Sequence, residues 1–235
     1  MINPLKHIRI IHGAFGIISA VSVQLSLAGT IDKPNVIFIL IDDGGYTGLG
    51  CYGSPFYETP NIDRLASQGI RFTDAYASCP VSSPTRSSIL TGKYTVNTGI
   101  TDFIPGRQNN EKLYCLPTER LKAQPFKLFL DLNEITIAEL LRKDGYKTMI
   151  SGKWHLGGEM EYGPEHQGFD IARGVRRGLG SPRYFLPYGL SDFDDGPVGE
   201  YLTDRQTDEA IRFMEDNKDR SEEHTSELQS RQVIS

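Results

Sequence analysis

The sequence has few of the residues that would commit it to several common classes of protein. Its 235 residues include 3 cysteines and a single tryptophan. The cysteines Cys51, Cys79 and Cys115 do not have metal-ligand spacing, which argues against a structural zinc site and leaves one disulfide or buried thiols as alternatives. Charge is nearly balanced, with 25 Lys and Arg against 30 Asp and Glu. A net charge of −5 provides no basic surface for nucleic acid, so we exclude nucleic acid as a partner.

Long apolar runs are scarce, and the one at the N-terminus has the order of a secretory signal. Lys6 and Arg9 precede an apolar stretch over residues 10–27, and Ser26-Leu27-Ala28 supplies the small residues that a signal peptidase reads. The pattern predicts a signal peptide over residues 1–28, hence export, with no membrane attachment after cleavage. A membrane anchor is the alternative, but Ser and Gln interrupt the stretch and its length is marginal.

Strand and helix patterns alternate along the rest of the chain. Apolar, β-branched Val36–Ile41 predicts a strand covered on both faces, and residues 70–77 and 146–150 also have strand patterns. Helices are predicted after Pro60, from Pro84 to a stop at Gly92, over residues 138–145 with a capping box at Thr136, and over residues 202–214. This order predicts an α/β fold with a mostly parallel central sheet and helices on both faces.

Two polar clusters follow predicted strands, where sites form in parallel sheets. Asp42 and Asp43 place hard oxygen donors together, which suits calcium or magnesium, although Asp-Gly is also ordinary turn material. Lys153 and His155 flank Trp154, so alternation points both toward one ligand while the indole packs beneath. That arrangement favours an anionic substrate with the histidine as proton donor, the alternative being a core histidine and a surface lysine.

The stretch CPVSSPTRSSILTGKY contains a third candidate site. A helix that begins near Pro84 directs its free N–H groups at Ser82 and Ser83, and Arg86 in its first turn adds a forked donor. These features suit a tetrahedral oxyanion. A serine-capped helix with a solvent-facing arginine is the alternative interpretation.

Taken together, these segments resemble the sulfatase family, a branch of the alkaline-phosphatase-like superfamily. SSPTR followed by LTGK resembles the family signature (Cys or Ser)-x-Pro-x-Arg with its trailing Thr-Gly. Three further blocks are similar and occur in the family's order over most of Asn35 to Phe169: NVIFILIDDGG, TPNIDRLASQGIRFTDAYA and GKWHLG. The resemblance implies the sulfatase-like α/β fold, here truncated before its C-terminal part.

The resemblance also implies an activity and its cofactors. The expected function is that of a sulfuric ester hydrolase acting on a sulfated glycan or an aryl sulfate. Ser82 would be converted to Cα-formylglycine, whose hydrate is the nucleophile, by the anaerobic-type bacterial sulfatase-maturating enzyme that accepts serine. Asp42 and Asp43, together with the modified Ser82, would bind Ca²⁺. The exported protein would then be periplasmic or extracellular.

Three further roles are carried over by position. Arg86 would stabilise the formylglycine hydrate, Lys153 would bind sulfate, and His155 would assist the formylglycine chemistry or the leaving group. Two rival functions remain: a phosphoester hydrolase or phosphotransferase of the same superfamily, and a non-catalytic sulfoglycan-binding relative in which Ser82 stays unmodified.

The C-terminal residues do not continue the domain pattern. The string RSEEHTSELQS, Arg220 to Ser230, resembles a translated sequencing-adapter oligonucleotide, with a natural polar tail as the alternative. We expect residues 33–219 to be the N-terminal portion of a sulfatase catalytic domain and residues 220–235 to be non-native. On this basis the chain by itself is expected to be inactive.

Overall fold

The structure is a computed structural model that describes residues 34–105, 124–178, 183–193, 196–218 and 232–234. The chain divides into two units, Met1–Pro34 and Asn35–Ser235, and the description below concerns the second. The predicted signal peptide, Cys115 and the adapter-like string lie outside the described residues. Within the described ranges, no helix has the length and apolar character needed to cross a membrane.

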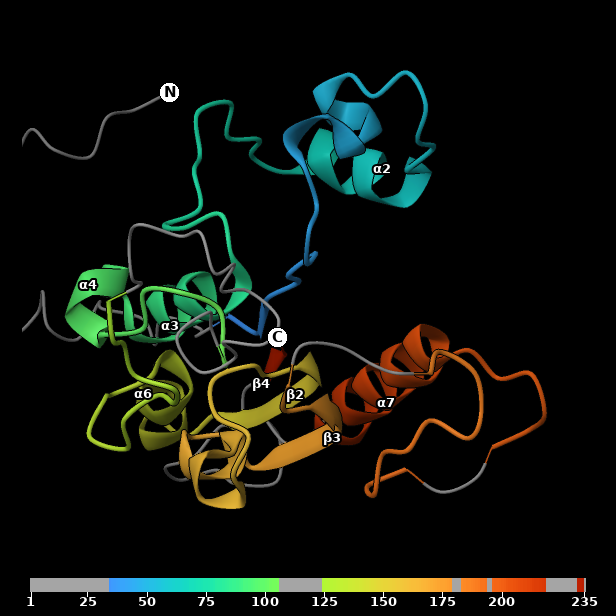
Figure 1. The fold of residues 1–235 in the computed structure, drawn as a ribbon. Coiled ribbons are helices and arrows are strands. Elements are labelled where there is room, and N and C mark those ends of the chain that lie inside the picture. Colours follow the sequence, from blue (N-terminus) through green and yellow to red (C-terminus); the bar gives the residue numbers. More distant parts are fainter. Residues whose placement is uncertain (1–33, 106–123, 179–182, 194–195, 219–231, 235) are drawn as a thin grey trace, which may run out of the picture. The chain divides into compact units, whose positions relative to one another are not determined.

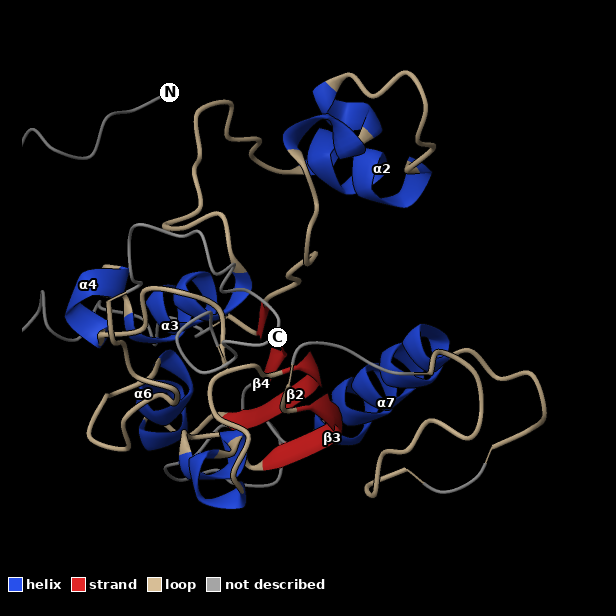
Figure 2. Ribbon diagram, in the orientation of Figure 1, coloured by secondary structure: helices blue, strands red, loops and turns tan. Residues whose placement is uncertain are grey.

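The sheet is parallel throughout its described strands, as the sequence predicts. Its order is β1-β4-β2-β3 (Figure 2). The strands are β1 (Val36–Ile37), β2 (Lys147–Lys153), β3 (Ile171–Arg176) and β4 (Gln232–Ile234). β4 separates the two strands that lead to the polar clusters, because Val233 pairs with both Val36 and Thr148. β4 lies within residues 220–235, the segment that the sequence predicts to be non-native.

Helices connect and cover these strands. The α-helices are α2 (Pro60–Gln68), α3 (Ser82–Thr91), α4 (Thr95–Thr98), α6 (Ile137–Lys143) and α7 (Leu202–Asn217). Short 3₁₀ helices span Tyr46–Gly48, Gly50–Tyr52, Met160–Tyr162 and Pro164–His166. The helices predicted at Pro60, near Pro84, at residues 138–145 and at residues 202–214 are therefore all confirmed.

Two neighbouring residues of β2 show that the sheet is covered on both faces. Met149 packs with Phe213 of α7, which lies alongside β2 and β3 (Figure 1). Ile150 points to the opposite face and joins a cluster with Leu90 of α3 and Ala138 of α6. Since successive side chains in a strand alternate between faces, helices cover both sides of β2. The prediction of helices on both faces of the sheet is therefore confirmed at β2.

The start of α6 forms as its local sequence dictates. The Thr136 hydroxyl accepts the Glu139 backbone N–H at 3.1 Å, and the Glu139 carboxylate accepts the Thr136 N–H at 2.8 Å. This reciprocal pair is the predicted capping box, which satisfies two N–H groups that the helix leaves without partners.

One strand prediction is wrong in extent and another is wrong altogether. The run Val36–Ile41 forms a strand only over its first two residues, and Ile39 is 74% exposed. A strand extends only as far as its ladder, and β4 pairs with β1 at two positions. Residues 70–77 form no strand, and Tyr76 is 89% exposed. Their alternation finds no partner strand among the described residues, and without one the pattern cannot form a sheet.

The sequence also missed β3 and the full length of β2. Ile171–Arg176 contains a glycine and two arginines, so it has no clear apolar alternation. It forms a strand because it pairs in parallel with β2. Strand β2 continues past Ile150 through Gly152 to Lys153.

Candidate active site

Helix α3 places Ser82 at its positive end. The residue before it, Val81, is extended, and the helix ends at Gly92, whose φ of 67° is left-handed. Pro84 is tolerated because N–H groups of the first turn have no acceptor within the helix. Ser82 is thus the first helical residue, beside N–H groups that favour negative charge.

The end of β2 turns Lys153 and His155 toward α3. The pairing of β2 with β3 shifts register between Ser151 and Lys153, and Gly152 there has a φ of 116° that favours glycine. Trp154 is 1% exposed and donates its indole N–H to the Tyr162 carbonyl at 2.9 Å. The buried indole therefore fixes this segment from below, as the sequence predicts.

Ser82 lies between a cation and an imidazole. Arg86 donates from Nε to the Ser82 Oγ at 3.0 Å, and His155 Nδ1 lies 3.2 Å from the same oxygen. The other ring nitrogen, Nε2, lies 2.6 Å from the carbonyl oxygen of Ile104. A carbonyl can only accept, so Nε2 carries the hydrogen and Nδ1 is free to accept the Ser82 hydroxyl proton. His155 is placed to act as a base toward Ser82.

Asp42 joins this group through the two cations. Lys153 Nζ lies 2.5 Å from Asp42 Oδ2, and Arg86 Nη2 lies 3.7 Å from the same atom. Arg86 also donates from Nη1 to the Lys153 carbonyl at 2.6 Å. The structure therefore brings together five of the six predicted site residues: Asp42, Ser82, Arg86, Lys153 and His155.

The sixth, Asp43, is exposed, and no hydrogen bond within the described ranges links it to that group. Its backbone is nevertheless distinctive. Asp43 has a φ of 58° and His155 a φ of 57°, and in the described part of the chain these two are the non-glycine residues with positive φ. Such conformations cost energy and gather at functional sites, which agrees with the position of both residues in predicted site motifs.

The pKa values of two site groups follow from their surroundings. Burial acts to raise the pKa of Asp42, but the hydrogen bond and charge of Lys153, with the charge of Arg86, hold it below its usual value. Burial lowers the pKa of His155, and the charges of Lys153 and Arg86 add to this effect against the opposing Ile104 hydrogen bond. Asp42 is thus ionised and His155 neutral at pH 7, the states needed for an acceptor and a base.

Acidification should destabilise the protein through His155. Its folded-state pKa lies below the ordinary 6.5, so the unfolded chain binds the proton more readily. The contribution is fully present above the unfolded-state pKa and is lost as pH falls through it toward the folded-state pKa. Urea unfolding at about pH 8 and about pH 5 should therefore show a larger loss in the wild type than in His155→Asn, since asparagine tolerates left-handed φ. Equal losses in the two proteins would contradict this assignment.

The described residues do not by themselves fit a calcium ion. Calcium takes about six to eight oxygen ligands. Here the candidate donors are the Asp42 and Asp43 carboxylates and the Ser82 hydroxyl, and Asp42 is already paired with the Lys153 ammonium. Across the described ranges, no group of three or more His, Cys, Asp or Glu side chains is arranged to hold a metal.

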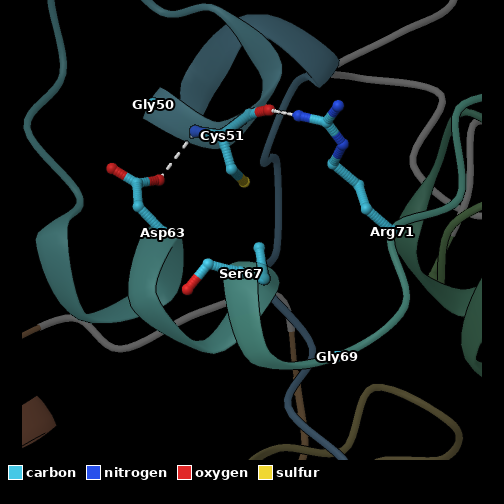
Figure 3. A pocket seen from close by; sticks show the side chains of 7 residues that line it. Gly50, Cys51, Asp63, Ser67, Gly69 and Arg71 are labelled. Carbon is cyan, nitrogen blue, oxygen red and sulfur yellow. Dashed lines mark hydrogen bonds between the residues drawn. The ribbon is translucent and has the colours of Figure 1, made fainter.

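A separate pocket of about 450 Å³ lies beside α2, and none of the six site residues lines it (Figure 3). Its carboxylate, Asp63, accepts the Cys51 N–H at 2.7 Å and the Thr59 hydroxyl at 2.9 Å. Arg71 donates to the Cys51 carbonyl. These polar groups satisfy one another, which indicates a structural role.

Cys51 and Cys79 are both free thiols.

The fold is a parallel α/β sheet with helices on both faces, and its cluster of Asp42, Ser82, Arg86, Lys153 and His155 lies at the carboxyl end of β2. The sulfatase family profile matches residues 34–224. The chain belongs to the sulfatase family.

Relatives agree with this assignment. The chain is 41% identical to human arylsulfatase A over 159 residues, which are 66% of this chain and 28% of that protein. It is 36% identical to N-acetylgalactosamine-6-sulfatase of Rattus norvegicus over 168 residues, 71% of this chain and 29% of the relative. The chain thus spans less than a third of the length of these relatives.

A solved structure supports the fold. The structure of BT4656 in complex with its substrate D-glucosamine-2-N,6-O-disulfate superposes with a TM-score of 0.59 at 30% identity. The match covers 86% of this chain and 33% of that one. The predicted sulfatase-like α/β fold class is confirmed.

Sequence reasoning missed one contributor to the site. The Ile104 carbonyl, which holds the far side of the His155 ring, is a backbone group in a stretch that carries no motif. Because any residue has a carbonyl, no side-chain signal could have found it.

Proposed function

We propose that the protein is a sulfuric ester hydrolase that removes sulfate from a sulfated glycan, with aryl sulfates as simpler substrates. One observation carries the proposal: the Ser82 Oγ sits within hydrogen-bond reach of both Arg86 Nε and His155 Nδ1. This places a donor and a base on the atom that family resemblance assigns as the nucleophile.

Each residue then has a defined task. His155, neutral and with Nδ1 free, accepts a proton from the hydroxyl at position 82. Arg86 donates to the oxygen at that position and stabilises charge that develops on it. Lys153, 2.5 Å from Asp42 in this structure, is the cation available to a bound sulfate oxygen. Asp42 balances the two cations.

The proposal includes modification of Ser82. In the family pattern this position becomes Cα-formylglycine, whose hydrate attacks sulfur and later expels sulfate, and the Ser82 Oγ stands in for one hydroxyl of that hydrate. The proposed partner is an anaerobic-type sulfatase-maturating enzyme. Calcium at Asp42 and Asp43 stays a prediction of the resemblance, because a complete site would need further oxygen ligands.

The substrate class rests on relatives. N-acetylgalactosamine-6-sulfatase is named for a sulfated amino sugar, and BT4656 was solved with a disulfated glucosamine. We propose a sulfated glycan for this protein on that basis.

We also propose that the protein is exported to the periplasm or the medium. N-terminal sequencing of the mature protein would test this by finding cleavage after Ala28.

Mass spectrometry and turnover assays test the proposal together. The protein is co-expressed with a maturating enzyme, and the tryptic peptide of residues 72–86 should lose two hydrogen atoms at Ser82. Because the chain by itself is expected to be inactive, turnover is measured on a form extended by the rest of the catalytic domain. Its hydrolysis of sulfate esters of N-acetylhexosamines and of an aryl sulfate is compared with that of the matching phosphate esters.

The outcomes separate the rival functions. Conversion of Ser82 with preference for sulfate supports the hydrolase. Preference for phosphate esters would assign the protein to the phosphoester branch. An intact serine in the native host, together with binding of the sulfated sugar, would make it a binding protein.

A further inference from the structure

We propose that Ser83, the neighbour of the reacting position, is a positioning residue that sets the tautomer of His155. It acts through the backbone of Ile104. The inference deepens the proposed function, because it concerns the base that faces Ser82.

Two contacts link Ser83 to His155, and the first of them is a buried hydrogen bond. The Ser83 side chain is 0% exposed, and its Oγ accepts the backbone N–H of Ile104 at 3.1 Å. Helix α3 does not use this hydroxyl as a cap, since its N-cap is Val81 without a side-chain bond. The Ser83 hydroxyl is instead committed to a segment distant in the sequence.

The second contact joins the same residue to the imidazole. The Ile104 carbonyl accepts from His155 Nε2 at 2.6 Å. Ile104 is therefore held at its N–H by Ser83 and offers its C=O to His155. A neutral imidazole carries one N–H, so fixing that hydrogen on Nε2 leaves Nδ1 as the acceptor. The position of the Ile104 carbonyl thus decides which ring nitrogen carries the hydrogen, and with the hydrogen on Nε2 the Nδ1 that faces Ser82 is the acceptor.

The two serines act on opposite nitrogens of the His155 ring, Ser82 by direct contact and Ser83 through Ile104. Successive helical residues point about 100° apart, so Ser82 and Ser83 address different neighbours from one turn of α3. Ser82 reaches Nδ1 directly, and Ser83 reaches Nε2 through Ile104. Because His155 is 1% exposed, water does not compete freely for either nitrogen.

The test replaces Ser83 in the full chain and measures directly which nitrogen of the His155 ring carries the hydrogen. In the wild type, the ¹⁵N NMR signals of His155 at a single alkaline pH should show the hydrogen on Nε2. Ser83→Ala should give a mixture of both tautomers. The Ile104 amide should also exchange with solvent about tenfold faster, as expected for loss of one buried hydrogen bond.

Ser87→Ala is the matched control. Ser87 lies on the same helix, is also 0% exposed, and bonds to the Pro84 carbonyl and to Thr98. Its loss should destabilise the protein to a similar extent while leaving the His155 tautomer and the Ile104 exchange rate unchanged. A purely structural role for Ser83 would instead make the two variants behave alike.

Three results would overturn the inference: a single unchanged tautomer in Ser83→Ala, equal tautomer mixtures in both variants, or a wild-type hydrogen on Nδ1. The last needs no variant and holds even if Ser83→Ala fails to fold. Failure of the proposed function is distinguishable, because it appears as an unconverted Ser82 while the tautomer result stands. Ser83 occupies a variable position of the signature, so Ser83→Ala should still be converted at Ser82.

Discussion

Alanine in place of Ser82 should abolish both the proposed aldehyde and the hydrolysis that depends on it. The Ser82 Oγ is the atom that Arg86 and His155 both contact, and alanine removes it without disturbing their backbone. Removing a covalent nucleophile costs on the order of 10³-fold or more in turnover. The measurements are labelling of the matured protein with an aldehyde-reactive hydrazide, and aryl sulfate hydrolysis wherever the matured protein shows it.

Cysteine at the same position is the matched control. The family signature admits Cys or Ser there, so Ser82→Cys should be converted and labelled, whereas Ser82→Ala should not. Turnover by Ser82→Ala within about tenfold of the wild type would exclude position 82 as the nucleophile, since losing a nucleophile costs far more than that.

Loss of the Trp154 side chain should produce the largest change in stability. Trp154 is 1% exposed, packs edge-on against Phe169 with ring centroids 6.2 Å apart, and bonds to the Tyr162 carbonyl. Trp154→Ala removes this packing, leaves a cavity and strands a carbonyl, at an expected cost of about 3–5 kcal/mol in the free energy of unfolding. Urea denaturation measures the difference.

Trp154→Phe separates aromatic packing from the indole hydrogen bond. It keeps an aromatic ring against Phe169 but loses the indole N–H, so its cost should lie clearly below that of Trp154→Ala. Because the indole also holds the segment between Lys153 and His155, the alanine variant should loosen both site residues. A change under about 1 kcal/mol in Trp154→Ala would show that the segment is anchored elsewhere.

Features that depend on neighbouring residues could be read from the sequence. The capping box of α6 is determined by Thr136 and Glu139, three positions apart, and it forms as predicted. The position of Lys153 beyond a strand, with Trp154 buried beside it, was predicted from the strand pattern of residues 146–150, although β2 itself continues to Lys153. The approach of Lys153 to Asp42 could be expected because sites in parallel sheets form beyond the carboxyl ends of strands.

Features that depend on distant partners could not. Whether Val36–Ile41 forms six residues of strand or two depends on which distant segment pairs with it, and the pairs within the described ranges join only Val36 and Ile37 to residues 233 and 234. The same holds for His155: simple alternation would keep it extended, whereas its φ of 57° places it in the left-handed region. The contribution of Ile104 is made by its backbone, which composition does not reveal.

The sequence separation across the site also has a consequence for how the protein folds. Asp42 and Lys153, whose side chains lie 2.5 Å apart, are separated by 111 positions in the chain. Contacts of such long sequence separation form late because loop-closure entropy opposes them. On a nascent chain, β2, β3 and α7 can pack together first, and the site around Asp42 should be the last part to acquire its final geometry.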